Sequence, residues 1–76
     1  MSASTIVPVI ASFDSEGRIV PLYVRINGDS YKIESARMSC IFSNIVEFHC
    51  KVIDGEAIKP LLLTFYRREG MWTTHI

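Results

Sequence analysis

The sequence is poor in the residues that mark many specialised classes of protein. Its two cysteines, Cys40 and Cys50, are too few for the disulfide framework of a small secreted domain. Its four glycines form neither a phosphate-binding loop nor a dinucleotide-binding fingerprint, and no Gly-x-Ser-x-Gly motif is present. No apolar run approaches the roughly 18 residues of a membrane-spanning helix, since the longest candidate covers only 60–66. These absences argue against the common nucleotide-binding, hydrolase and membrane-spanning classes.

An excess of charge of either sign is also missing. Eight Lys and Arg residues balance eight Asp and Glu residues in a chain of 76 residues, so the formal net charge is zero. This balance removes the usual electrostatic argument for a nucleic-acid-binding protein. A hydrophobic fraction of 49% with 21% charged residues is typical of a folded chain. The length predicts a single small domain over 1–76.

The first residues argue against export. The segment MSASTIVPVIASF contains no basic residue, and Pro8 interrupts its apolar stretch, so no signal peptide is predicted. With so few cysteines, the predicted location is the cytoplasm. Cys40 and Cys50 are interpreted as thiols that pack like small apolar side chains.

Turn residues divide the sequence into short runs rich in Ile, Val, Thr, Tyr and Phe, which favour strands. The turn signals are 14–17, Asn27-Gly28, Asp54-Gly55 and Glu69-Gly70, and the Asn-Gly and Asp-Gly pairs suit tight hairpin turns. Six strands are predicted, over 5–13, 18–26, 29–38, 45–53, 57–68 and 71–76. The connector 39–44 is either irregular or part of a short helical turn over 35–43. The predicted fold is all-β, a six-stranded antiparallel meander curled into a small barrel or strongly bent sheet of the SH3-like or OB-like kind.

Hairpin register predicts one shared core face, because side chains alternate between the two faces of a strand. The turns place Val9 opposite Leu22, Val24 opposite Tyr31, Phe48 opposite Leu61, and Trp72 opposite Arg67. Pro8 and Pro21 cannot donate a backbone hydrogen bond, so they predict an edge or a bulge in the first hairpin. The predicted core consists of Val7, Val9, Ala11, Phe13, Val20, Leu22, Val24, Ile26, Tyr31, Ile33, Val46, Phe48, Cys50, Val52, Leu61, Leu63, Phe65, Trp72 and Ile76.

The opposite face of the first hairpin is also apolar. Ile6, Ile10, Ile19 and Tyr23 share the outward parity there. Apolar patches on small proteins commonly mark interfaces, so these residues predict a homodimer or binding to another protein. The alternative is that the connector 39–44 covers this face with its own apolar side chains.

The sequence predicts no catalytic, cofactor or metal site, and therefore a protein that is not an enzyme. His49 and Cys50 are adjacent on a strand and point to opposite faces, so they cannot share one ion. The predicted register places His49 beside Pro60 and His75 beside Thr64, roughly 16 Å apart at ~3.3 Å per residue and ~4.8 Å per strand. A catalytic cysteine–histidine pair is not predicted either.

Acidic residues gather at two of the turns. Asp14 and Glu16 lie in the first, and Asp54 and Glu56 lie at the third, without the spacing of a calcium-binding loop. Their predicted role is to form the turns themselves.

A second function remains open, because small barrels often bind nucleic acid. Tyr23, Arg25 and Lys32 are predicted neighbours on the outer face, and Arg67 and Arg68 end the fifth strand. Aromatic and basic side chains together can stack on bases and contact phosphates. The alternative function is therefore a small barrel that binds single-stranded nucleic acid.

Three segments carry a resemblance to other proteins: PLYVRINGDSYKI (21–33), IVEFHCKVIDG (45–55) and KPLLLTFYRREGMW (59–72). In these segments the chain resembles a group of short uncharacterised proteins from gut Firmicutes bacteria. The resemblance covers most of the chain and implies a bacterial, cytoplasmic, free-standing small domain. It carries over no activity and no catalytic or binding residue.

Overall fold

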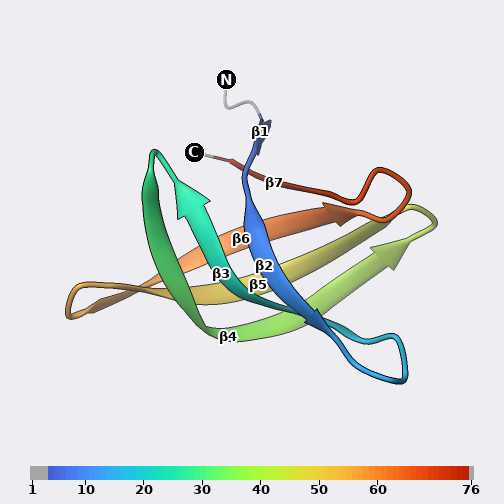
Figure 1. Cartoon of the computed structure of the whole chain (residues 1–76), viewed down its shortest axis with the longest axis horizontal. Helices are drawn as coiled ribbons and strands as arrows, with labels where there is room; N and C mark the ends of the chain where they lie inside the picture. The colour runs from blue at the N-terminus through green and yellow to red at the C-terminus, as the bar shows by residue number, and fades with distance from the viewer. Residues whose placement is uncertain (1–3, 76) are drawn as a thin grey trace.

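Within the described part of the chain, runs of β-branched and aromatic residues form seven strands of one antiparallel sheet. The computed structural model describes residues 4–75, except for the side chain of Cys40. The strands are β1 (Ser4–Ile6), β2 (Val9–Phe13), β3 (Ile19–Ile26), β4 (Asp29–Phe42), β5 (Ile45–Asp54), β6 (Ala57–Tyr66) and β7 (Met71–His75). Their order is β1-β7-β6-β5-β4-β3-β2, and the sheet curls strongly into a half-barrel (Figure 1). The all-β antiparallel prediction is confirmed, with seven strands in place of six.

The predicted first strand changes partner part-way along its length. It divides at Val7 and Pro8 into β1, which pairs with β7, and β2, which pairs with β3. The Val7 amide donates to the Trp72 carbonyl and the Arg25 amide donates to the Pro8 carbonyl, each at 3.0 Å. Pro8 has no amide hydrogen to donate, so the change of partner occurs where a ladder bond could not form. The N-terminal segment therefore contacts both ends of the meander.

The Asn27-Gly28 hairpin forms as predicted. The φ angles of Asn27 and Gly28 are 52° and 85°, the pair of positive values that a type I′ turn requires. Val24 lies opposite Tyr31, which confirms the predicted register.

The register predicted for the next hairpin is wrong by two residues. The turn contains Gly55 and Glu56, so Phe48 pairs with Leu63 and not with Leu61. A positive φ occurs at Gly55 alone, at 64°, which suits a type II′ turn with glycine in its first central position. A shift of two residues keeps every side chain on its predicted face.

The last hairpin shows the same two-residue shift. Tyr66 pairs with Met71 across a four-residue turn, so Trp72 lies opposite Phe65 and not opposite Arg67. The Gly70 amide closes this turn by donating to the Tyr66 carbonyl at 2.9 Å.

The first hairpin differs more, because it contains a β-bulge. Val9 pairs with Val24, and not with Leu22 as predicted. The register then shifts between Ile10 and Ala11, which leaves Leu22 without an opposite residue. A one-residue shift reverses the faces. On β3, Pro21 is therefore buried, whereas Val20 and Leu22 of the predicted core are exposed. Phe13, also predicted in the core, keeps its face opposite Ile19 but is 63% exposed at the end of β2.

The predicted connector 39–44 is mostly strand. β4 runs without a helical turn to Phe42, and the tight turn contains Ser43 and Asn44. Register shifts after Ile33 and after Met38 allow this long strand to bend from β3 toward β5. Ile41 and Phe42 remain 56% and 59% exposed, which contradicts the alternative that this segment covers the first hairpin with its apolar side chains.

The core lies on the concave face of the curled sheet. The Trp72 ring packs against Phe48 and Phe65, with ring centroids 5.5 Å and 4.7 Å away. Every buried apolar residue of the core cluster belongs to the predicted core: Val7, Val24, Ile33, Val46, Phe48, Cys50, Val52, Leu63, Phe65 and Trp72. Ile76, also predicted there, lies outside the described residues. Over residues 4–75 no helix is long and apolar enough to cross a membrane.

Candidate functional site

The predicted interface residues occupy two different environments. Ile10 and Tyr23 lie directly opposite each other on β2 and β3 and are 64% and 43% exposed, and Ile6 on β1 is 65% exposed. Ile19 is half-buried and packs against the core, because the bulge reverses its face. Val20 and Leu22 are exposed on the same hairpin. We call the exposed group Ile6, Ile10, Val20, Leu22 and Tyr23 the hairpin surface.

A shallow hollow of about 250 Å³ lies within this region. Its lining includes Pro8, Ile10, Tyr23, Arg25 and Ser30. In this hollow the positive side chain of Arg25 lies beside Ile10 and Tyr23, at the centre of the hairpin surface.

A second apolar group lies along β4. Met38, Ile41 and Phe42 are exposed in the part of the strand that follows its pairing with β3. The described pairing between β3 and β4 ends at Lys32, so the later part of β4 is bonded to β5 on one side. Sequence reasoning missed this edge because it expected a connector there.

The residues predicted for nucleic-acid binding are not brought together. Tyr23 lies directly opposite Lys32, and Arg25 lies near them on β3. Arg67 is at the far end of β4, where its Nη2 donates to the Ser43 carbonyl at 2.6 Å. About ten strand residues, on the order of 30 Å along β4, separate this contact from Lys32.

Arg68 lies in the same turn as Arg67. Its amide donates to Asn44 Oδ1 at 2.8 Å, while the Arg67 amide donates to the Asn44 carbonyl at 2.8 Å. These contacts tie the turn after β6 to the turn after β4. The two arginines therefore belong to a structural junction separate from the Tyr23 group.

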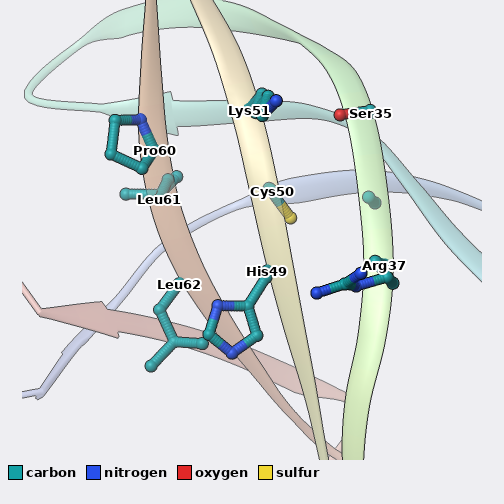
Figure 2. Close-up of a pocket in the computed structure, with 9 residues that line it drawn as sticks. Ser35, Arg37, His49, Cys50, Lys51, Pro60, Leu61 and Leu62 are labelled. Atoms are coloured by element: carbon teal, nitrogen blue, oxygen red, sulfur yellow. The ribbon is translucent and has the colours of Figure 1, made fainter.

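A groove of about 660 Å³ lies across the middle of β4, β5 and β6 (Figure 2). We call it the central groove. Its lining residues are Ser35, Ala36, Arg37, His49, Cys50, Lys51, Pro60, Leu61 and Leu62. Arg37 lies directly opposite His49, and Ser35 lies opposite Lys51. In Figure 2 the Arg37 side chain extends from β4 toward His49, and Leu62 lies beside the imidazole ring.

The charges of the central groove are unbalanced. Within residues 4–75, no carboxylate oxygen lies within 4.0 Å of a charged nitrogen of Arg37 or Lys51. Arg18 and Lys59, in contrast, contact Asp14 at 2.6 Å and Asp54 at 2.7 Å. The groove thus holds two cations that form no ion pair within that distance, beside an imidazole.

Cys50 lies beneath the groove and faces the core. Its side chain is buried among the core residues, and its thiol donates to the Phe48 carbonyl at 3.8 Å. Burial raises the pKa of the Cys50 thiol from its ordinary value of 9.0 to about 11. The thiol is therefore protonated at neutral pH and lacks the thiolate that covalent chemistry needs.

The side chain of Cys40 lies outside the described part of the chain. Its backbone pairs with Glu47, whereas Cys50 lies opposite Ala36. The two backbone positions are thus offset along β5.

The two histidines lie closer together than predicted. His49 pairs with Leu62 and not with Pro60. The β6–β7 register, continued one residue beyond Leu63 and Thr74, brings His75 beside Leu62 as well, two strands or about 10 Å from His49. His75 Nε2 lies 3.4 Å from Ser4 Oγ. In the described part of the chain, no three His, Cys, Asp or Glu residues are grouped as metal ligands.

The acidic residues of the first turn have the predicted structural role. Asp14 Oδ1 accepts hydrogen bonds from the amides of Glu16 at 2.9 Å and Arg18 at 2.8 Å. The hydrogen bond from the Arg18 amide is the first cause of a lowered Asp14 pKa, since it favours the carboxylate. Asp54 likewise accepts a hydrogen bond from Lys59 Nζ at 2.7 Å across the β5–β6 hairpin.

Comparison with known proteins brings no relative. No family model matches the chain, and no curated protein or solved structure shows significant similarity to it.

Proposed function

We propose that this protein is a non-enzymatic β-sheet module that binds protein, most simply a second copy of itself, through the hairpin surface. The observation that carries the proposal is the opposed pair Ile10 and Tyr23, 64% and 43% exposed. Covering such side chains on association removes apolar area from water, at about 25 cal/mol per Å². A zero net charge means that two copies do not repel each other over long range.

The finer fold class and the setting are part of the same proposal. We infer a small barrel of the SH3-like or OB-like kind, and the N-terminal strand that contacts both ends of the meander supports it. We also infer a cytoplasmic, bacterial protein. The free thiol of Cys50 is consistent with a reducing compartment.

Solution mass tests the interface. Light scattering coupled to size exclusion should give a dimer for the natural chain and a monomer for Ile10→Glu and Tyr23→Glu, because each glutamate would place a charge in the interface. Ile58→Glu is the matched control, since Ile58 is 55% exposed on a different hairpin. It should leave the dimer intact.

Two outcomes would count against the hairpin surface. A natural chain that stays monomeric at the highest soluble concentration would remove self-association. A dimer that Phe42→Glu dissociates, but Ile10→Glu does not, would transfer the interface to the edge of β4.

The alternative function, binding of single-stranded nucleic acid, is favoured by one contact, the direct pairing of Tyr23 with Lys32. Arg25 would supply a further phosphate contact, while Arg67 and Arg68 would form a separate contact at the other end of β4. Fluorescence anisotropy of a labelled oligonucleotide tests it. Binding should weaken steeply with salt and decrease in Lys32→Gln. Absent or salt-independent binding would remove this function.

A further inference from the structure

On the face of the sheet opposite the core, side chains from three neighbouring strands line the central groove in a regular grid. One row across the sheet contains Arg37, His49 and Leu62, and the next contains Ser35, Lys51 and Pro60. Residues directly opposite each other have Cβ atoms about 5 Å apart, and diagonal neighbours such as Arg37 and Lys51 about 7 Å. The polar half of the grid comes from β4 and β5, and its apolar edge comes from β6.

The two charged side chains of the grid favour an anion. The Arg37 guanidinium and the Lys51 ammonium donate hydrogen bonds and accept none, and the Ser35 hydroxyl and the His49 ring can each donate one more. The nearest carboxylates in sequence, Glu34 and Glu47, do not line the groove. Glu34 lies at the β-bulge before Ser35, and Glu47, which pairs with Cys40, is the next residue of β5 on the same face as His49.

We propose that the central groove binds a small phosphate monoester whose organic group is apolar or aromatic. The phosphate would lie among Arg37, His49, Lys51 and Ser35, and the organic group would lie against Pro60 and Leu62. This site is separate from the hairpin surface and does not depend on the self-association proposed above.

Charge decides between a phosphate and a carboxylate ligand. A phosphate monoester carries close to two negative charges at neutral pH, which matches the two permanent cations of the groove. A carboxylate carries one charge and would leave the other cation uncompensated. Arginine also presents a planar pair of donors that suits two oxygens of one phosphate.

Four ligands separate the contributions of charge and apolar contact. Phenyl phosphate has both parts of the proposed ligand, inorganic phosphate lacks the ring, benzoate has one charge, and phenol has none. Two-dimensional NMR of the amide-labelled protein should show saturable shifts around Arg37, His49, Lys51 and Leu62 with phenyl phosphate. Inorganic phosphate and benzoate should bind more weakly, and phenol should not saturate.

Matched variants test whether the groove itself is responsible. Arg37→Gln and Lys51→Gln should each weaken phenyl phosphate by about fivefold to tenfold, the effect of losing one charge-assisted hydrogen bond near water. Arg25→Gln and Lys32→Gln remove the same charges outside the groove and should leave the affinity unchanged. All four side chains are exposed, so Trp72 fluorescence should confirm the native fold in each variant.

Several results would overturn the proposal. Shifts that rise linearly without saturation, or equal losses in the groove variants and their controls, would show only general attraction to cations. Benzoate binding more tightly than phenyl phosphate would exclude the phosphate assignment. A single-stranded oligonucleotide that shifts the groove amides and displaces phenyl phosphate at lower concentration would assign the groove to nucleic acid.

Discussion

Cys50 shows how strongly burial changes one residue. Its pKa of about 11 means that the folded protein keeps the thiol proton at a pH where the unfolded chain has lost it. Ionisation therefore favours unfolding as the pH rises from about 9 to 11, and stability falls in that window by an amount on the order of 2 kcal/mol. Urea titrations of the natural chain and Cys50→Ala at several pH values would measure this loss as the difference between the two. Parallel pH dependences would contradict it.

The same burial should make the Cys50 thiol unreactive. At neutral pH an alkylating reagent should leave Cys50 unmodified in the native protein and modify it rapidly in denaturant, because both thiolate and access are then available. Peptide mass spectrometry reads Cys50 separately from Cys40. Rapid native labelling of Cys50 would show that the core opens on the time scale of the reaction.

Thr74 is a buried polar residue with a specific function in the sheet. It is 1% exposed, and its Oγ1 donates to the Leu62 carbonyl at 2.7 Å. Thr74→Val keeps the shape but removes the donor, so it should lower the free energy of unfolding by about 1 kcal/mol. Thr73→Val is the control, since no side-chain hydrogen bond of Thr73 is present among the described contacts. Urea unfolding followed by Trp72 fluorescence compares the two, and equal effects would contradict the role of the hydroxyl.

The hairpin of β3 and β4 depends on two residues with positive φ. Gly28, at φ 85°, would be strained by any side chain, although nothing lies within 4 Å of the position that a Cβ would occupy. Gly28→Ala should therefore destabilise the protein by about 1 kcal/mol through backbone strain alone. Asn27→Gly keeps the positive φ accessible and should change stability by less than about half of that. Thermal unfolding measures both, and a neutral Gly28→Ala would show that the turn can change type.

The bulges of β4 determine which side chains line the central groove. Counting back from the turn at Ser43 and Asn44 without interruption would place Arg37 opposite Cys50, on the core side. The shift between Met38 and Cys40 instead places Arg37 opposite His49 on the outer face. The extra residue of β4 at this bulge thus places the Arg37 side chain in the central groove.

The whole molecule depends on a small core that is shared by most of its strands. Leu63 is completely buried on β6, and it pairs with Phe48 on one side and Thr74 on the other. Leu63→Ala should cost about 2–5 kcal/mol, which is a large fraction of the stability of a domain this small. Ile58→Ala, on an exposed side chain of the same strand, should cost less than about 1 kcal/mol. Urea unfolding followed by Trp72 fluorescence compares them, and similar losses would mean that the core is not centred on Leu63.

The sequence alone determined the antiparallel all-β class, the type I′ turn and all ten buried apolar residues of the core cluster. These follow from turn chemistry and from the two-residue period of strands, both of which act between neighbours in the chain. The two-residue errors in the register of the β5–β6 and β6–β7 hairpins left the predicted core residues correct, because an even shift keeps each side chain on its face.

Only the tertiary structure decided where the first strand changes partner, where the bulges lie and which surface residues meet. The position of a bulge depends on where a strand must bend to follow the curvature of the whole sheet. The local sequence pattern does not encode that curvature. The bulge beside Leu22 moved Ile19 toward the core and exposed Val20, and the bulge near Ser39 brought Arg37 beside His49. The core could therefore be predicted from the sequence. The hairpin surface could be predicted only in part, and the central groove could not be predicted.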